Sequence, residues 1–123
     1  MKKLDKFIAR RRQIAQQYDN AFGALKNIFR PQFGIEFSNH SGHHLYVLRF
    51  DLKNLRLSRA KIMARLKAQN IGSQVHYIPI YQQPYHAKKM HVSKDQFPNT
   101  EEYYQNCLSI PLYPNMTDDD VAY

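Results

Sequence analysis

The sequence has little of several features on which other protein classes depend. It has 123 residues, one cysteine, no tryptophan and only four glycines, which are scattered. A single cysteine, Cys107, excludes an internal disulfide and a cysteine-based zinc site. Scattered glycines leave no loop that could cradle a phosphate, and the nucleophile motif GxSxG is absent. The sequence therefore contains no self-contained enzyme site of a familiar type.

Long apolar runs are missing as well. The longest have only a few residues, so we predict no membrane span and no signal peptide, and we expect a cytoplasmic protein. The length fits one domain over residues 1–123. Apolar residues make up 43% of the chain, with nine tyrosines and seven phenylalanines, which is enough for a folded core.

Acidic residues are outnumbered by basic ones. The chain has 18 Lys and Arg against 10 Asp and Glu, a net charge of +8, and much of the surplus lies in the opening MKKLDKFIARRRQ. This balance favours an anionic partner: a nucleic acid, an acidic membrane surface or a phosphorylated small molecule. No nucleic-acid motif is present, and the basic residues surround the first helix instead of forming one stripe. A free-standing basic module that binds RNA or a phosphorylated small molecule is therefore an alternative, with nucleic acid the less favoured partner.

The first half of the chain has three clear element signals. Apolar residues at helical spacing from Leu4 to Leu25 predict a long amphipathic helix that is already under way at the start. Residues 33–37 could form a short extended piece, and the alternating HHLYVLRFDL predicts a strand. Ser58 is a predicted N-cap for a second helix that ends at QNIG, with Asn70 in the left-handed position of a Schellman-type stop.

The second half alternates in the same way. Residues 74–78 are predicted as a strand that Pro79 stops, and Asn99 with Glu102 as a capping box for a helix running past Cys107. SIPLYP is predicted to be extended, and Thr117 is the N-cap of a final helix. That helix has barely begun when the sequence ends, so we expect both termini to cut through structured elements. This order predicts an α/β fold of the α+β two-layer type, a small, mainly antiparallel sheet with helices on one face.

The stretch SQVHYIPIYQQPYH, residues 73–86, is the candidate binding segment. Alternation would put Gln74 and His76 on one strand face, where a sheet normally carries Val or Ile, and buried polar groups need partners. A ligand or a second protein surface could supply them. The alternative is a strand leaving the sheet, with Pro79 and Pro84 stiffening a loop and the tyrosines adding bulk.

The histidines do not predict a metal site. Adjacent strand residues point to opposite faces, so only one of His43 and His44 could join His40. Three or four converging ligands are needed for zinc, and HExxH is absent, so no metal is expected.

Four blocks together resemble a known family. They are LDKFIARRRQIAQQYDNAF, HHLYVLRFDL, LKAQNIGSQVHYIPIYQQPYH and FPNTEEYYQNCLSIPLYPNMTDDDVAY, in the right order and over nearly the whole chain. They are similar to the C-terminal small domain of the DegT/DnrJ/EryC1/StrS sugar aminotransferases, enzymes of fold type I that use pyridoxal phosphate. Within that family, IGSQVHYIPIYQQPYH is most similar to the transaminases of pseudaminic acid synthesis, which make UDP-4-amino-4,6-dideoxy-N-acetyl-L-altrosamine for flagellin glycans.

The resemblance implies roles for particular residues. His76 and Tyr77 match the family's HY element, which lines the substrate side of the site. Tyr81 stands where many relatives carry His, and Gln83 and His44 are further substrate-binding candidates. Because strand alternation would separate His76 from Tyr77, we expect one of them, His76, to touch the ligand. No residue of this chain is assigned a catalytic role.

The resemblance also implies partners outside this chain. The family's large domain, with pyridoxal phosphate, its Schiff-base lysine and the acid beside the pyridine nitrogen, has no counterpart here, so we expect no cofactor on this chain alone. The complete enzyme would be a homodimer that moves an amino group from glutamate to carbon 4 of a UDP-4-keto-6-deoxy-N-acetyl sugar. This chain by itself would be inactive.

Overall fold

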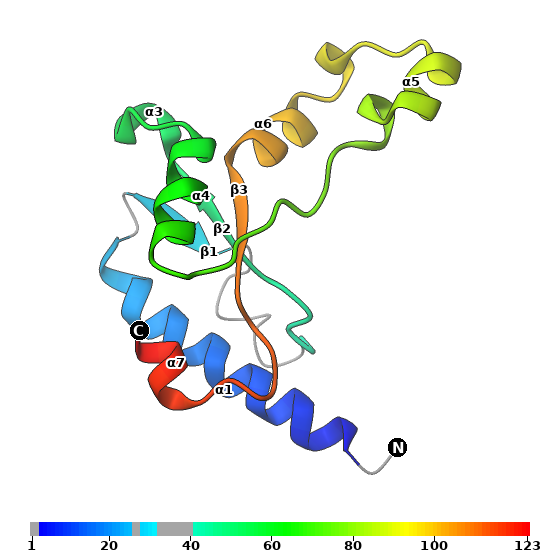
Figure 1. The fold of residues 1–123 in the computed structure, drawn as a ribbon. Coiled ribbons are helices and arrows are strands. Elements are labelled where there is room, and N and C mark those ends of the chain that lie inside the picture. Colours follow the sequence, from blue (N-terminus) through cyan, green and yellow to red (C-terminus); the bar gives the residue numbers. More distant parts are fainter. Residues whose placement is uncertain (1–2, 26–27, 32–40) are drawn as a thin grey trace.

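The computed structural model of the protein describes residues 3–25, 28–31 and 41–123. The predicted extended piece at residues 33–37 lies outside these residues. The elements are, in chain order, helix α1 Leu4–Phe22, turn η1 Gly23–Leu25, strand β1 Phe29–Pro31, strand β2 Tyr46–Phe50, helix α3 Leu52–Leu55, helix α4 Arg59–Ala68, turn η2 Ile80–Gln82, helix α5 Pro84–Met90, turn η3 Lys94–Gln96, helix α6 Pro98–Asn106, strand β3 Cys107–Ile110 and helix α7 Asp118–Ala122 (Figure 1).

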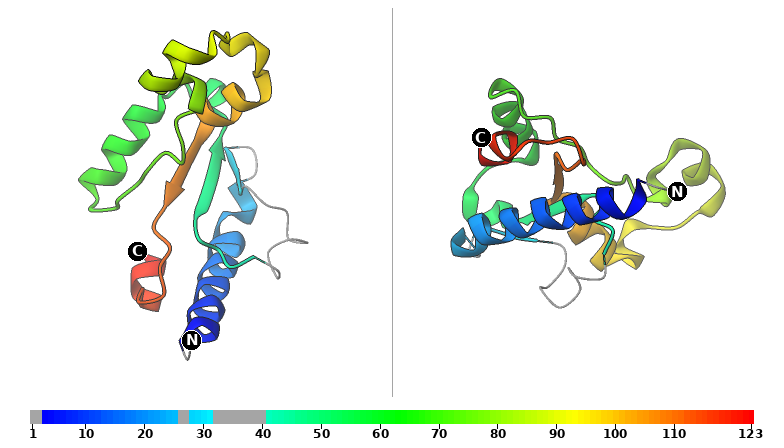
Figure 2. Two further views of the ribbon diagram at one scale, coloured as in Figure 1. Left: turned by 90° about the vertical axis from the view of Figure 1, so that its right-hand side faces the viewer. Right: turned by 90° about the horizontal axis from the view of Figure 1, so that it is seen from below.

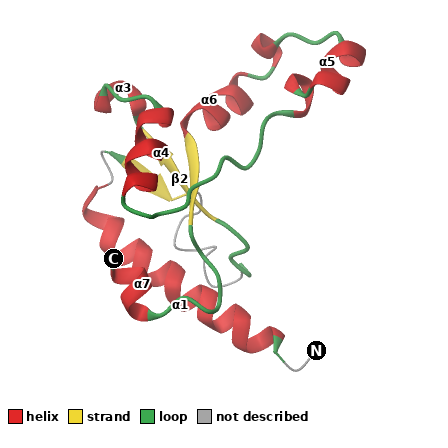
Figure 3. Ribbon diagram, viewed as in Figure 1, coloured by secondary structure: helices red, strands yellow, loops and turns green. Residues whose placement is uncertain are grey.

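The three described strands form one antiparallel sheet in the order β1–β2–β3 (Figure 3). Tyr46 pairs with Ile110 and Leu48 with Leu108, so these four side chains lie on the same face of the sheet. As the middle strand, β2 is buried on both faces, and Tyr46, Val47 and Leu48 are all buried. The strand predicted from HHLYVLRFDL is confirmed.

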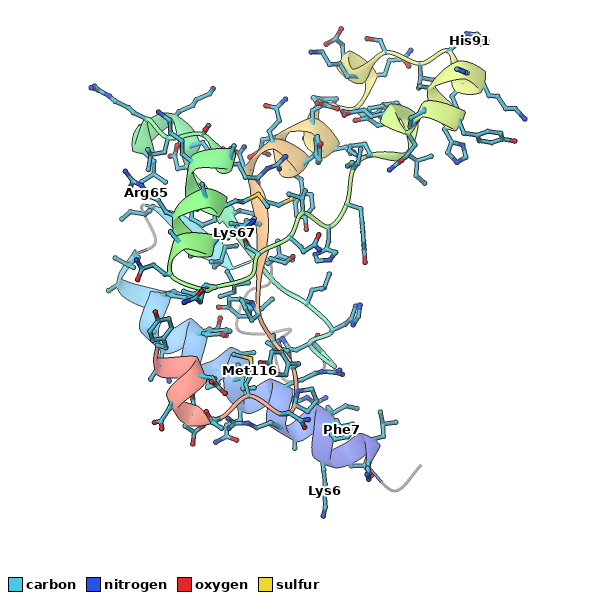
Figure 4. The ribbon with its side chains drawn as sticks, viewed as in Figure 1. Lys6, Phe7, Arg65, Lys67, His91 and Met116 are labelled. Carbon is cyan, nitrogen blue, oxygen red and sulfur yellow. The ribbon has the colours of Figure 1, made fainter. Side chains whose placement is uncertain are left out.

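The core lies between α1 and one face of the sheet. It contains Ile14 and Tyr18 from α1, Tyr46 and Leu48 from β2, and Met116 from the segment before α7. The rings of Tyr18 and Tyr46 are tilted against each other with centroids 5.0 Å apart. The apolar stripe of α1 is buried only over its second half. Figure 4 shows Phe7 near the start of this helix, away from the sheet, and Figure 2 shows α7 beside α1.

Local capping signals in the sequence are confirmed. The Ser58 side chain accepts a hydrogen bond from the Lys61 amide at the start of α4. At its end, Asn70 has φ 59° and the Ile71 amide donates to the Leu66 carbonyl, as in a Schellman stop. Thr117 caps α7, and the reciprocal bond from the Asp120 side chain completes a capping box.

Two element predictions are wrong in part. Residues 74–78 form no strand, and one isolated bridge joins Gln74 to Ser109. Helix α6 begins at Pro98 without a side-chain cap from Asn99, because proline at the first helical position fixes the start. It ends at Asn106, and Cys107 starts β3 instead of lying inside the helix. Pairing with β2 overrides the local helical pattern there.

The predicted fold class is confirmed: helices combined with a small antiparallel sheet. Helices α1, α4 and α7 border the same sheet face, the one that carries Leu48 and Ile110. At the opposite end from α1 and α7, residues 77–97, which we call the arm, carry η2, α5 and η3 and extend away from the sheet (Figures 1 and 2). No helix in the described part of the chain is long and apolar enough to span a membrane.

Candidate functional site

The candidate binding segment starts on the outer edge of β3. The Ser109 amide donates to the Gln74 carbonyl at 2.7 Å, and the Gln74 amide donates to the Ser109 carbonyl at 3.1 Å. This pair of bonds fixes the backbone beside the sheet for one residue. The chain then turns away along β3 toward the arm (Figure 1).

His76 and Tyr77 lie together at this edge. The Nδ1 atom of His76 lies 2.8 Å from the Ser109 hydroxyl oxygen, and Ser109 is buried. The two rings meet edge to face with centroids 4.7 Å apart, and a cis peptide bond joins the residues. His76 is half-buried, whereas Tyr77 is 68% exposed. Because no strand forms at residues 74–78, the alternation argument that separated these two side chains is wrong. The structure brings them into contact.

Tyr81 belongs to a separate cluster at the base of the arm. Its hydroxyl donates to Glu101 Oε1 at 2.7 Å, and its ring stacks on Phe97 at 4.8 Å. The Gln82 side chain donates to the same carboxylate oxygen. Partial burial, the hydrogen bond to Glu101 and its negative charge raise the pKa of Tyr81 to about 12. The same hydrogen bond lowers the pKa of Glu101.

The other two predicted site residues are placed differently. Gln83 is the N-cap residue of α5 and is half-buried, but its side chain makes no cap hydrogen bond. His44 is exposed in the segment before β2. Within the described residues, no hydrogen bond joins His44 to the 76–83 segment. The structure thus groups His76 with Tyr77 and Tyr81 with Glu101 through the contacts above.

Sequence reasoning missed Ser109 and Glu101, the two residues that hold these groups in place. Ser109 is 33 positions from His76, and Glu101 is 20 positions from Tyr81. A polar residue in the buried strand β3 was the one signal for Ser109, since buried hydroxyls need a partner. Glu101 had no signal beyond its position in the first turn of a helix.

Several basic residues of α1 have structural contacts. Arg10 donates to the Met116 carbonyl at 2.6 Å and forms an ion pair with Asp118 at 2.8 Å. Arg12 donates to the Ser41 carbonyl at 2.9 Å. These contacts tie α7 and the segment before β2 to the helix. Part of the positive charge that predicted an anionic partner therefore serves the fold.

The described residues do not fit a pyridoxal phosphate site. Such a site needs an enclosed lysine amine that can form a Schiff base. Every lysine in residues 3–25, 28–31 and 41–123 is exposed to solvent. In the same ranges, no three His, Cys, Asp or Glu side chains gather in a metal-binding group.

A large apolar hollow lies on the other side of the sheet. Its volume is about 960 Å³, and its walls come from α1, β2, α4 and the C-terminal residues. Leu48, Phe50 and Ile62 line it together with Leu66 and Ile110. The hollow faces the α1 side of the sheet, because Leu48 and Ile110 share the Tyr46 face, whereas Ser109 and His76 belong to the opposite face.

The sequence was matched by one protein family and by known relatives. The sequence pattern of the "DegT/DnrJ/EryC1/StrS aminotransferase family" matches residues 1–123. The spore coat polysaccharide biosynthesis protein SpsC of Bacillus subtilis is 40% identical over 122 residues, which are 98% of this chain and 31% of that protein.

Two solved structures are similar in fold. Helicobacter pylori PseC, an aminotransferase involved in the biosynthesis of pseudaminic acid, aligns with a TM-score of 0.83 and 25% identity over 98% of this chain and 31% of its own. A putative sugar aminotransferase of Streptococcus pneumoniae in its PLP form aligns with a TM-score of 0.82 and 24% identity over 99% of this chain and 30% of its own. The chain thus spans about a third of the length of these relatives. It belongs to the DegT/DnrJ/EryC1/StrS aminotransferase family.

Proposed function

We propose that this chain is the C-terminal small domain of a pyridoxal phosphate-dependent nucleotide-sugar aminotransferase. The family match over residues 1–123 and the 40% identity to SpsC support it. Because the chain spans 31% of SpsC and 31% of PseC, the activity belongs to a longer protein. Residues outside this chain would supply the cofactor lysine, since the described lysines are all exposed. By itself the chain is inactive.

The reaction is the transfer of an amino group from glutamate to carbon 4 of a UDP-4-keto-6-deoxy-N-acetyl sugar. Pyridoxal phosphate, when bound, supplies the electron sink for this chemistry. The residues of this chain bind and orient the sugar nucleotide. The observation that carries this assignment is the His76–Tyr77 pair, which Ser109 anchors to β3 while Tyr77 is 68% exposed. A polar and an aromatic ring fixed at an open edge suit a sugar with a nucleotide attached.

The further substrate-binding candidates stay within this proposal. Gln83 is half-buried at the base of α5, and His44 is exposed before β2. Tyr81 contributes through its position on the arm, because its hydroxyl already donates to Glu101. Similarity to PseC supports pseudaminic acid synthesis as the pathway. The proposal also includes a homodimer that works in the cytoplasm.

The second candidate is a free-standing module that binds RNA or a nucleotide sugar, which the net charge of +8 favours. The salt dependence of binding separates an RNA-binding module from the enzyme domain. We expect UDP-N-acetylglucosamine to bind this chain weakly, with similar affinity at about 50 and 200 mM salt. If the chain instead contacted six or more phosphates of an RNA, its affinity for that RNA would fall about a thousandfold or more over that range. Tight, steeply salt-dependent RNA binding without any nucleotide-sugar binding would support the module and contradict the enzyme domain.

Activity gives the complementary test. We expect no amino transfer when this chain alone is mixed with pyridoxal phosphate, glutamate and a UDP-4-keto sugar. Turnover by the chain alone would contradict the assignment as a small domain, provided that the replacement of one particular lysine of this chain abolishes it.

A further inference from the structure

Ser109 holds the candidate binding segment through three hydrogen bonds. Its backbone exchanges two bonds with Gln74, and its hydroxyl lies 2.8 Å from His76 Nδ1. Ser109 is only 4% exposed and lies in β3, which pairs along its length with the central strand. The imidazole of His76 is therefore tied directly to the sheet. The arm, which begins at the next residue, does not set its position.

The direction of the Ser109–His76 bond follows from the burial of the serine. A neutral imidazole carries one proton, so Nδ1 either donates to the hydroxyl or accepts from it. Within the described residues, His76 is the single hydrogen-bond partner of the Ser109 hydroxyl. If Nδ1 donated, the buried hydroxyl proton would have no acceptor, which is unfavourable. The Ser109 hydroxyl therefore donates, and Nδ1 accepts.

The other ring nitrogen then carries the proton of the neutral ring. Nε2 has no hydrogen-bond partner among the described residues, and His76 is half-buried at the sheet edge. The ring of Tyr77 meets it edge to face, which restricts rotation of the imidazole plane. A neutral ring held in this way offers an N–H donor and accepts from nothing outside the protein.

We propose that Ser109 is a positioning residue that fixes neutral His76 as the Nε2–H tautomer, so that His76 recognises a ligand through an acceptor oxygen. This rests on the proposed function for the class of ligand, a nucleotide sugar, whose carbonyl, hydroxyl and phosphate oxygens can all accept. The Nε2–H group of His76 thus selects for an acceptor oxygen at that point of the ligand.

The test reads the tautomer of His76 in this chain by NMR. With ¹⁵N-labelled histidine and a spectrum at about pH 8.5, where an ordinary imidazole is neutral, we expect wild type to show Nε2 protonated and Nδ1 as an acceptor. The His76→Gln variant assigns the signals. In Ser109→Ala the ratio of the Nδ1–H tautomer to the Nε2–H tautomer should rise about fivefold, because the variant loses the free energy of one ordinary hydrogen bond. Ser109→Thr keeps a hydroxyl and should restore the wild-type ratio.

Ser93→Ala is the matched control, because the Ser93 side chain caps η3 on the arm and should leave the His76 tautomer unchanged. A wild-type spectrum with the proton on Nδ1 would overturn the proposal, and this result does not depend on whether a Ser109 variant folds. A tautomer ratio that Ser109→Ala leaves unchanged in a folded protein would overturn it as well.

A ligand titration separates this proposal from the proposed function. UDP-N-acetylglucosamine should shift the His76 Nε2 signal in wild type and shift it less in Ser109→Ala. If the tautomer depends on Ser109 as expected while the sugar nucleotide leaves the His76 signals unmoved, the ligand role of His76 is wrong and its positioning by Ser109 stands.

Discussion

The hydroxyl of Tyr81 donates to Glu101, so this hydrogen bond already stabilises the base of the arm and the hydroxyl proton is not free to bind a ligand. Stacking on Phe97 and the second bond from Gln82 to the same carboxylate give the cluster three contacts. At the scale of single residues, partners of this kind decide whether a polar side chain in a motif is available for binding.

Replacing Glu101 by Gln should lower the pKa of Tyr81 from about 12 toward the ordinary value of 10.0. The amide keeps the shape but removes the negative charge that opposes a phenolate. A raised pKa means that the contact stabilises the fold fully below about pH 10 and loses this contribution as the pH rises through about 12. NMR of ¹³C-labelled tyrosine measures it, with Glu102→Gln as the control. A Tyr81 pKa that stays near 12 in Glu101→Gln would contradict the assignment.

The sequence offered His76 and Tyr77 as candidates only through the family motif, and the strand-alternation argument beside it was wrong. Alternation assumed a strand, but one bridge at Gln74 is all that pairs there. Their partner Ser109 lies 33 residues away, and nothing local indicates which strand neighbour a polar side chain will meet. Candidate residues could be named from the sequence, whereas the contacts that orient them could not.

At the scale of elements, signals confined to a few neighbouring residues were sufficient. Ser58 and Thr117 cap helices through bonds to amides three residues on, and Asn70 ends α4 in the left-handed conformation. The failures at residues 74–78 and at Cys107 involve β3, whose pairing depends on residues about 60 positions earlier. Local propensity does not contain that information.

Asn70 provides a matched pair of variants. Its φ of 59° is costly for an ordinary side chain and free for glycine. Asn70→Ala should lower the free energy of unfolding by about 1 kcal/mol. Asn70→Gly should leave it unchanged or raise it slightly, as measured from urea denaturation midpoints at constant slope. Equal effects of the two replacements would show that the left-handed stop does not limit stability.

Arg10 is expected to hold α7 on α1, since it contacts both the Met116 carbonyl and Asp118. In Arg10→Gln we expect amide exchange in residues 116–123 to become roughly tenfold faster, because charge-assisted bonds are lost. Arg65→Gln, at an exposed position on α4 that lies apart from Met116 in Figure 4, is the control. Exchange in this segment at the wild-type rate would refute the role of Arg10.

The same contact predicts an acid dependence. Its hydrogen bond to Arg10 lowers the pKa of Asp118. A lowered pKa contributes stability that is present above the ordinary aspartate value and is lost as the pH falls through the folded value. Acid should therefore release α7 less in Arg10→Gln than in wild type. The variant has already lost the stabilisation that the Arg10–Asp118 contact gives at neutral pH. An identical pH dependence of α7 release in both proteins would contradict this role of the Arg10–Asp118 contact.

At the scale of the whole molecule, much apolar surface is left in contact with water. The hollow beside α4 has a volume of about 960 Å³, and Ile80 and Tyr85 are more than 60% exposed on the arm. Patches of this kind mark interaction surfaces. We expect the isolated chain to self-associate, with a light-scattering mass above 14.6 kDa that rises with concentration. Ile80→Ser should reduce this rise more than Lys67→Ser, and a monomer at all concentrations would contradict the prediction.

The main proposal is that these residues form the sugar-nucleotide side of an aminotransferase site whose cofactor is held by residues outside this chain. Transfer of ¹⁵N from glutamate to a UDP-4-keto-6-deoxy-N-acetyl sugar, by the product of the complete reading frame that contains this chain, tests it most directly. We predict transfer that requires pyridoxal phosphate, and a His76→Ala variant whose KM for the sugar nucleotide rises about tenfold while its KM for glutamate stays the same. A complete product that transfers no nitrogen, or a His76→Ala variant with unchanged KM values, would contradict the claim.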